Sequence, residues 1–169
     1  MSRHHIFRHM PFSPHDLHDL AWDVEDYPNF IKFISAIRLL KSAKNEMRAE
    51  VRVQYKMLRE SFVTNITREP DDGEILVSLV SGPFKDLNNR WQFHPLADGS
   101  TLVEFMVSYR FSISWLGKLF GSKQSRAEHK VLRAFENRAA SRFTEIKTPH
   151  EFEHQVRSEI AELKATFKH

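Results

Sequence analysis

Apolar and polar residues alternate along much of the first two thirds of the chain, and this alternation predicts β-strands. In the clearest run, 50–57, Val51, Val53, Tyr55 and Met57 are separated by charged or polar residues. A period of two places these apolar side chains on one face and leaves the other face to water, as in an antiparallel sheet. The strands predicted in this way span 3–12, 37–41, 50–57, 62–68, 74–80, 90–95 and 102–111.

Two short helices are predicted between the first two strands. Ser13 can cap the first one, Pro14 suits the first helical position, and Asp16 favours the positive end of the helix. The segment 26–28 then restarts the chain, and a second short helix is expected over 29–33.

The pattern changes to a helical period in the last third of the chain. Apolar residues recur at spacings of three and four over 115–145, which predicts one long amphipathic helix. The segment 148–151, Thr-Pro-His-Glu, has the form of a capping box with proline at the first helical position. We therefore expect an α+β domain over 1–146, in which a curved antiparallel sheet wraps a long helix, and an amphipathic helical extension over 147–169.

The composition favours a protein with a large apolar interior and excludes cysteine chemistry. There are 14 phenylalanines against three tyrosines and three tryptophans, and phenylalanine supplies apolar area without a polar group. The absence of cysteine excludes disulfides, thiolate metal sites and cysteine nucleophiles. No run approaches the roughly 20 apolar residues of a membrane span, and the first residues have no apolar signal core. We expect a cytoplasmic protein.

Aromatic residues gather around a turn between two of the predicted strands. Gly82 and Pro83 are a strong turn signal, and Phe84, Trp91 and Phe93 follow closely. Bulky apolar side chains are unusual in a plain solvated loop. This segment is therefore interpreted as the rim and wall of an apolar cavity.

Four motifs, in this order, resemble the coenzyme Q-binding family of the START-like superfamily. They are DVEDYPNF at 23–30, LRESF at 58–62, GPFKDLNNRWQF at 82–93 and AFENRA at 134–139. The resemblance implies a helix-grip fold with an apolar tunnel that binds ubiquinone or a related polyprenyl lipid and supports respiratory electron transfer as a lipid carrier, without catalysing a reaction. The chain departs from the family pattern at Lys32, where the family usually has proline.

The same resemblance leaves two other functions open. The family includes bacterial members described as ribosome-association toxins, which are said to block subunit joining. The wider superfamily, which takes in polyketide cyclases and lipid transport proteins, also contains enzymes. A fold alone does not decide between these functions. The order of preference is a quinone carrier, a ribosome-associated factor and a cyclase-like enzyme, so that no enzyme activity and no catalytic cofactor is expected.

The ligand-binding residues expected from this interpretation are aromatic or aliphatic, and the alternative for each is an ordinary core position. They are Tyr27, Phe30, Phe33, Leu58, Phe62, Phe84, Trp91, Phe93, Phe105, Val131 and Phe135. A quinone head is expected near Tyr27, Lys32 or Lys85.

Titratable residues near the first helix are interpreted as solvated. His15 and His18 share one helix side, next to Asp16 and Asp19, but no further cluster of ligands stands out, so no metal site is expected. The acidic residues within 23–26 are likewise expected at a solvated helix end rather than in an acid–base site.

The long helix carries an excess of positive charge, although the whole chain has a net charge of only +3. The alternatives are a solvated face, attraction to anionic lipid headgroups, and attraction to RNA phosphates. The residues expected on a membrane or RNA surface are Lys118, Lys123, Arg126, Lys130 and Arg133. The preferred interpretation is a protein peripheral to the inner membrane, with the ribosome as the alternative partner.

Overall fold

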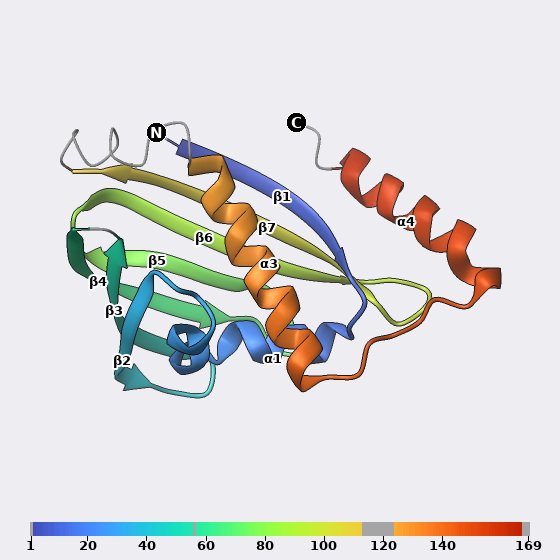
Figure 1. Cartoon of the computed structure of the whole chain (residues 1–169), viewed down its shortest axis with the longest axis horizontal. Helices are drawn as coiled ribbons and strands as arrows, with labels where there is room; N and C mark the ends of the chain where they lie inside the picture. Colours follow the sequence, from blue (N-terminus) through green and yellow to red (C-terminus); the bar gives the residue numbers. More distant parts are fainter. Residues whose placement is uncertain (1, 56, 113–123, 167–169) are drawn as a thin grey trace.

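A strongly curved antiparallel sheet forms the body of the molecule in the computed structural model, which describes residues 2–55, 57–112 and 124–166 (Figure 1). In the described part of the chain the sheet has seven strands in the order β1-β7-β6-β5-β4-β3-β2. The strands are β1 (Ser2–Met10), β2 (Ile34–Ser42), β3 (Glu46–Tyr55), β4 (Leu58–Arg68), β5 (Ile75–Ser81), β6 (Phe84–Pro95) and β7 (Thr101–Phe111). The predicted α+β class and the helix-grip arrangement are confirmed.

The register of the sheet places one apolar face on the inside of the curve. Strand β1 pairs with β7 so that Ile6 lies opposite Phe105, and β6 pairs with β7 so that Trp91 lies opposite Phe105. These three side chains belong to one apolar core together with residues of β3, β4 and β5. The alternation in the sequence therefore identifies the side of each strand that the core covers.

The first helix forms as predicted, and the second differs. Helix α1 (Pro14–Trp22) is capped by Ser13, whose Oγ accepts a hydrogen bond of 3.2 Å from the backbone N–H of Asp16. The second helical segment is the 3₁₀ helix η1 (Val24–Asn29), so the helix expected over 29–33 is wrong. The backbone N–H groups of Phe30 and Ile31 both bond to the carbonyl of Tyr27, which closes the helix before 31.

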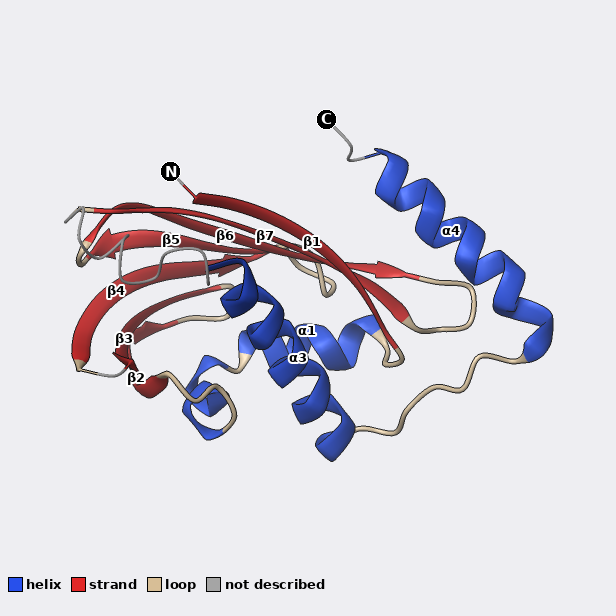
Figure 2. Cartoon of the chain, turned by 45° about the horizontal axis from the view of Figure 1, so that its top comes forward, coloured by secondary structure: helices blue, strands red, loops and turns tan. Residues whose placement is uncertain are grey.

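Helix α3 (Gln124–Arg142) crosses the concave face of the sheet, as Figure 2 shows. Its buried side chains Leu132, Phe135 and Ala139 are at most 2% exposed and face the core. The helix ends three residues before the predicted end at 145, because the chain turns and the N–H of Ile146 bonds to the carbonyl of Pro11 at 2.7 Å. The predicted start at 115 lies outside the described residues.

The last helix packs on the face of the sheet opposite α3. A 3₁₀ turn, η3 (His150–Phe152), leads into α4 (Glu153–Thr166). Apolar residues of this tail form a second small core with the outer face of β1 and β7 and with the turn that follows β6. Its members are Phe7, Leu96, Leu102, Phe152, Val156, Ile160 and Leu163.

The capping box predicted at 148–151 does not form. The hydroxyl of Thr148 donates to Asp98 Oδ2 at 2.6 Å, and Pro149 precedes η3 without a side-chain cap. The tail is instead held to the β6–β7 turn, where Glu159 Oε1 accepts from the N–H of Ala97 at 3.0 Å. Of the helices in the described ranges, none is both long enough and apolar enough to cross a membrane.

Candidate functional site

An apolar cavity of about 190 Å³ lies between the concave face of the sheet, η1 and α3. Six of the residues expected to bind a ligand line it: Tyr27, Phe33, Trp91, Phe105, Val131 and Phe135. The remaining lining comes mainly from aliphatic side chains of β2 to β5 and the α1–η1 end, which the sequence interpretation did not include. They are Ala21, Val24, Ile31, Ile34, Ile37, Ala49, Val51, Ile66, Ile75 and Val77.

Aromatic rings form one wall of the cavity. The ring of Trp91 lies 4.7 Å from that of Phe135 and 4.8 Å from that of Phe105, centroid to centroid. Tyr27 meets the edge of Phe135 at 5.2 Å. These tilted and edge-to-face contacts are the preferred geometries of aromatic pairs, so the wall is well packed.

Two expected residues lie one layer away from the cavity. Phe30 packs edge-on against Tyr27 and Phe135, with centroid distances of 5.7 and 5.2 Å. Phe93 stacks on Trp91 at 6.1 Å and makes an edge-to-face contact with His18 at 5.7 Å. Both side chains support residues that line the cavity without lining it themselves.

The aromatic residues around the β5–β6 turn form a separate cluster. Phe84 meets Phe62 at 5.3 Å and stacks on Phe111 at 4.9 Å. The turn is tight, with β6 starting directly at Phe84, and neither Phe62 nor Phe84 lines the cavity. Leu58 begins β4, and its side chain is outside the described part of the chain.

The β5–β6 turn requires glycine at position 82, because a larger residue would clash with β4. Gly82 has a φ of +147°, and a Cβ at this position would lie 2.4 Å from the Cβ of Phe62. The glycine therefore allows the backbone of the turn to contact β4 closely.

Three of the described side chains that line the cavity are polar, and two of them have hydrogen-bond partners. The buried hydroxyl of Tyr27 donates to the carbonyl of Ala21, and burial raises the pKa of this phenol, so it stays neutral. Asn89 Nδ2 donates to the carbonyl of Met106 at 2.8 Å. Thr64 is 2% exposed, and its Oγ1 has no hydrogen-bond partner among the described residues.

Charged pairs join α3 to η1 and to β1. Arg138 forms a bidentate pair with Asp26, with distances of 2.7 and 3.0 Å, and Arg8 Nη2 lies 2.6 Å from Glu136 Oε2. The Arg138 hydrogen bonds lower the pKa of Asp26, so the pair stabilises the fold above the ordinary carboxyl pKa and loses this effect as pH falls through the lowered value. Asp26 is 12% exposed, so the interpretation of this acid as solvated is wrong.

The basic residues predicted on the long helix are only partly described. Lys130 and Arg133 are exposed on α3. Lys118 and Lys123 lie outside the described residues, as does the side chain of Arg126. The two lysines suggested for a quinone head, Lys32 and Lys85, are exposed and do not line the cavity.

The two histidines of α1 were predicted to be exposed to solvent, and only one of them is. His15 and Asp19 are exposed, whereas the side chain of His18 is 2% exposed. Asp72 comes from the β4–β5 turn to join them, so the view that no further ligand accompanies these histidines is wrong. The sequence carries no signal for this contact, because His15 and Asp72 are 57 positions apart.

Comparisons with known proteins place the chain in one family. The family described as polyketide cyclase/dehydrase and lipid transport matches residues 10–136. The ribosome association toxin RatA of Rickettsia prowazekii is 35% identical over 133 residues, which cover 77% of this chain and 90% of the relative. The mitochondrial coenzyme Q-binding protein COQ10 homolog B of Xenopus laevis is 27% identical over 103 residues, covering 59% and 42%.

Solved structures support the same fold. An 18 kDa protein of Caulobacter crescentus is 35% identical, with a TM-score of 0.69, and the match covers 83% of this chain and 97% of that one. A START superfamily protein of Mycobacterium smegmatis superimposes with a TM-score of 0.71 at 17% identity, covering 82% and 97%. The second likeness concerns the fold alone.

Proposed function

The chain belongs to the polyketide cyclase/dehydrase and lipid transport family, and on this basis we propose that it binds a polyprenyl quinone, such as ubiquinone, in the apolar cavity. Binding of this kind makes the protein a carrier or chaperone for a respiratory lipid. The similarity to a relative named as coenzyme Q-binding supports the choice of ligand class. The observation that carries the proposal is a lining that is almost entirely apolar and contains one hydroxyl without a hydrogen-bond partner among the described residues.

The lining matches a ligand that is mostly apolar and has a hydrogen-bond acceptor. None of the described lining residues carries a charge, and Thr64 places a hydroxyl without a protein partner in this apolar wall. A buried hydroxyl without a partner is costly. A quinone carbonyl that accepts a hydrogen bond from Thr64 removes this cost, while the methyl groups of the ligand contact the aliphatic walls.

The size of the cavity limits how much of the ligand it holds. At about 190 Å³ it exceeds an engineered cavity of about 150 Å³ that binds benzene, and it is below the range of about 300–1,000 Å³ usual for drug-sized ligands. It therefore suits one substituted ring or a short part of an isoprenoid tail. A long tail needs further space, through widening between α3 and the sheet.

Binding rather than catalysis is the better match to these residues. Acid–base catalysis needs a titratable group within hydrogen-bond reach of the substrate. The described lining offers a neutral phenol, an amide and a hydroxyl, and the phenol and amide already donate to backbone carbonyls.

The proposal predicts opposite effects of Thr64→Val on binding and on stability. Without the hydroxyl, quinone affinity is expected to fall about two- to tenfold, the value of one ordinary hydrogen bond. The free energy of unfolding of the ligand-free protein is expected to stay the same or to rise, because the replaced group has no partner in the described structure. Quinone titration monitored by tryptophan fluorescence and urea unfolding measure the two effects.

Thr67→Val is the matched control, since Thr67 lies on the same strand and is not part of the lining. Unchanged quinone affinity in Thr64→Val would remove this hydroxyl from the proposed site. A loss of stability in Thr64→Val would mean that the hydroxyl has a structural partner.

Ribosome association is a second candidate, favoured by the names of relatives at 30–35% identity. A protein that binds ribosomal RNA needs exposed cations, and Lys130 and Arg133 supply two on α3. The same cations suit an anionic membrane, where a lipid carrier loads and unloads. We place the membrane first, because it gives the cavity and the basic surface one joint role.

Reversing the charge of this surface is expected to separate membrane binding from ligand binding. The double change Lys130→Glu and Arg133→Glu is expected to weaken binding to vesicles of anionic lipid about tenfold or more, at roughly 1 kcal/mol per cation. Quinone content is expected to stay near that of the unchanged protein. Vesicle sedimentation and organic extraction measure the two quantities.

The control has the same change of charge on α4, with Arg157→Glu and Lys164→Glu, both at exposed positions. It is expected to bind vesicles almost normally. If instead the unchanged protein sediments with ribosomal subunits, ignores anionic vesicles, and loses the ribosome when Lys130 and Arg133 are reversed, the ribosome is the partner.

A further inference from the structure

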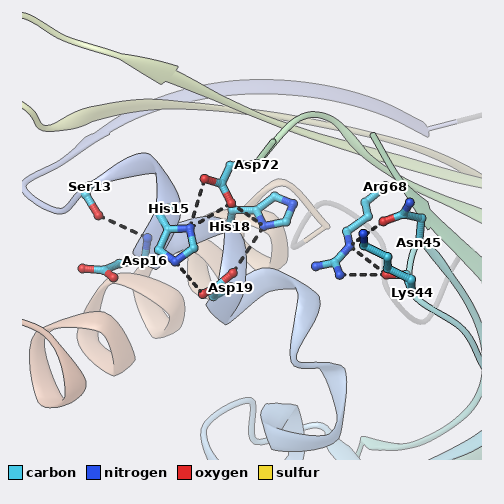
Figure 3. Close-up of polar contacts among 9 residues, drawn as sticks. All are labelled: Ser13, His15, Asp16, His18, Asp19, Lys44, Asn45, Arg68 and Asp72. Atoms are coloured by element: carbon cyan, nitrogen blue, oxygen red, sulfur yellow. Dashed lines mark hydrogen bonds and ion pairs between the residues drawn. The ribbon is translucent and has the colours of Figure 1, made fainter. Parts of the chain in front are cut away.

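A cluster of two histidines and two aspartates lies outside the cavity, between α1 and the β4–β5 turn (Figure 3). His15, Asp19 and Asp72 each place one ligand atom within 4.8 Å of the others. His18 joins them with Nδ1 3.4 Å from Asp72 Oδ1 and 3.6 Å from Asp19 Oδ1. The helix contributes residues spaced by three and four, which share one face, and the turn contributes the carboxylate opposite them.

His18 is buried in the cluster without a hydrogen bond from any described residue to either of its ring nitrogens. Its side chain is 2% exposed, and neither ring nitrogen has a hydrogen-bond partner among the described residues. Nδ1 points to both carboxylates, at 3.4 Å from Asp72 Oδ1 and 3.6 Å from Asp19 Oδ1, without forming a hydrogen bond to either (Figure 3). A buried nitrogen without a partner is costly, and an ion between it and the carboxylates supplies one.

We propose that His15, His18, Asp19 and Asp72 bind a divalent transition-metal ion of the zinc type. Zinc is held by imidazole nitrogen and carboxylate oxygen at about 2.0–2.2 Å in a tetrahedron, which sets neighbouring ligand atoms about 3.3–3.6 Å apart. His15 Nδ1 lies 3.0 Å from Asp72 Oδ1, and His18 Nδ1 lies 3.4 Å from Asp72 Oδ1 and 3.6 Å from Asp19 Oδ1. These atoms of the two histidines and the two aspartates are thus close to the spacing that such an ion requires.

One nitrogen of His15 can bind the ion. The ring contacts Asp72 Oδ1 through Nδ1 at 3.0 Å and Asp19 Oδ2 through Nε2 at 3.2 Å, and Nδ1 is the nitrogen that shares Asp72 Oδ1 with His18.

The charges around the cluster also suit a cation. Two carboxylates face the two imidazole rings, and Asp16 lies in the same turn of α1. The guanidinium of Arg68 lies on the His18 side and donates to the carbonyl of Lys44 at 2.7 Å and to Asn45 Oδ1 (Figure 3), so the two carboxylates must outweigh its positive charge. A bound ion would fasten α1, whose Ala21 lines the cavity, to the β4–β5 turn. The inference does not depend on the proposed lipid function.

The test is zinc titration of the chain, purified without a polyhistidine tag and stripped of metal. Isothermal titration calorimetry is expected to give one zinc ion per chain, with little binding of Mg²⁺ or Ca²⁺, which prefer sites made of oxygen alone. Zinc at about one hundred times its Kd is expected to raise Tm by roughly 5–10 °C. The ring-nitrogen NMR signals of His18 are expected to move during the same titration.

Two variants locate the ion. Asp72→Asn removes the charge and retains a residue that tolerates the φ of +59° at this position, and His15→Gln acts at an exposed helix position. Each is expected to weaken zinc binding at least tenfold and to abolish the shift in Tm. The control is His150→Gln, which removes an exposed histidine that lies 3.3 Å from Glu153 in another part of the chain.

Three results overturn the inference. They are the absence of stoichiometric zinc binding, equal affinity in Asp72→Asn and the unchanged chain, and a loss of affinity in His150→Gln as large as in His15→Gln. Any of these would leave the cluster as a set of ion pairs between α1 and the turn.

Discussion

Replacing Trp91 with alanine is expected to lower the free energy of unfolding by about 3–5 kcal/mol, and to remove quinone binding from the protein that still folds. Trp91 is 5% exposed and contacts the rings of Phe105, Phe135 and Phe93. Loss of a buried indole costs its transfer free energy and leaves a void. The same ring forms one wall of the cavity, so the ligand loses a large contact surface. Chemical denaturation and quinone titration measure the two losses.

Phe93→Ala is the control that separates the role of Trp91 in the core from its role in the site. Phe93 is on the same strand and face, is 9% exposed and stacks on Trp91, but does not line the cavity. It is expected to lose a similar free energy of unfolding and to keep most of its quinone affinity under conditions where both variants are folded. Equal loss of affinity in the two variants would identify Trp91 as an ordinary core residue.

Gly82→Ala is expected to destabilise the fold by about 2–5 kcal/mol, although it adds one methyl group to an exposed turn. The φ of +147° is strained for any residue with a Cβ, and the added carbon would lie 2.4 Å from the Cβ of Phe62. Strain of this kind costs about 1–3 kcal/mol, and forced overpacking a similar amount. Thermal and urea unfolding measure the effect.

Gly99→Ala separates backbone strain from the steric clash. Gly99 has a φ of +87°, but the nearest atom to an added Cβ is Ile146 Cδ1 at 3.9 Å. Its replacement is expected to cost about 1–2 kcal/mol, from conformation alone. If both variants lose the same free energy, contact with Phe62 is not the reason for glycine in the β5–β6 turn.

The positions and faces of the strands were predictable from the sequence, whereas several of their ends were not. The apolar period in 50–57 identifies β3, because inward residues of a strand meet the core, but Met57 lies beyond the strand and is 97% exposed. Strand β6 starts at Phe84 and not at 90 as expected. The prediction missed the first half of the strand because that half is mostly polar. Cross-strand partners hold that half in place, among them Arg110 for Asp86 and the carbonyl of Met106 for Asn89.

The candidate site was predictable in its aromatic part only. Trp91 and Phe105 stand in the inward phase of strongly patterned strands, so their place at the cavity follows from the sequence. Thr64 is one threonine among others in a β-strand, and only the packing around it shows that its hydroxyl lacks a partner. The contact of His18 with Asp72 depends on how α1 sits against a distant turn, and no local pattern encodes it.

The most direct test of the lipid proposal is mass spectrometry of an organic extract from the purified protein after incubation with quinone-loaded vesicles. The matched variant is Ala49→Ile, because Ala49 is fully buried and lines the cavity, so that a larger side chain fills the space without removing any wall. We expect close to one quinone per chain in the unchanged protein and a small fraction of that in Ala49→Ile. An unchanged protein recovered without quinone, or equal quinone in both, would contradict the proposal.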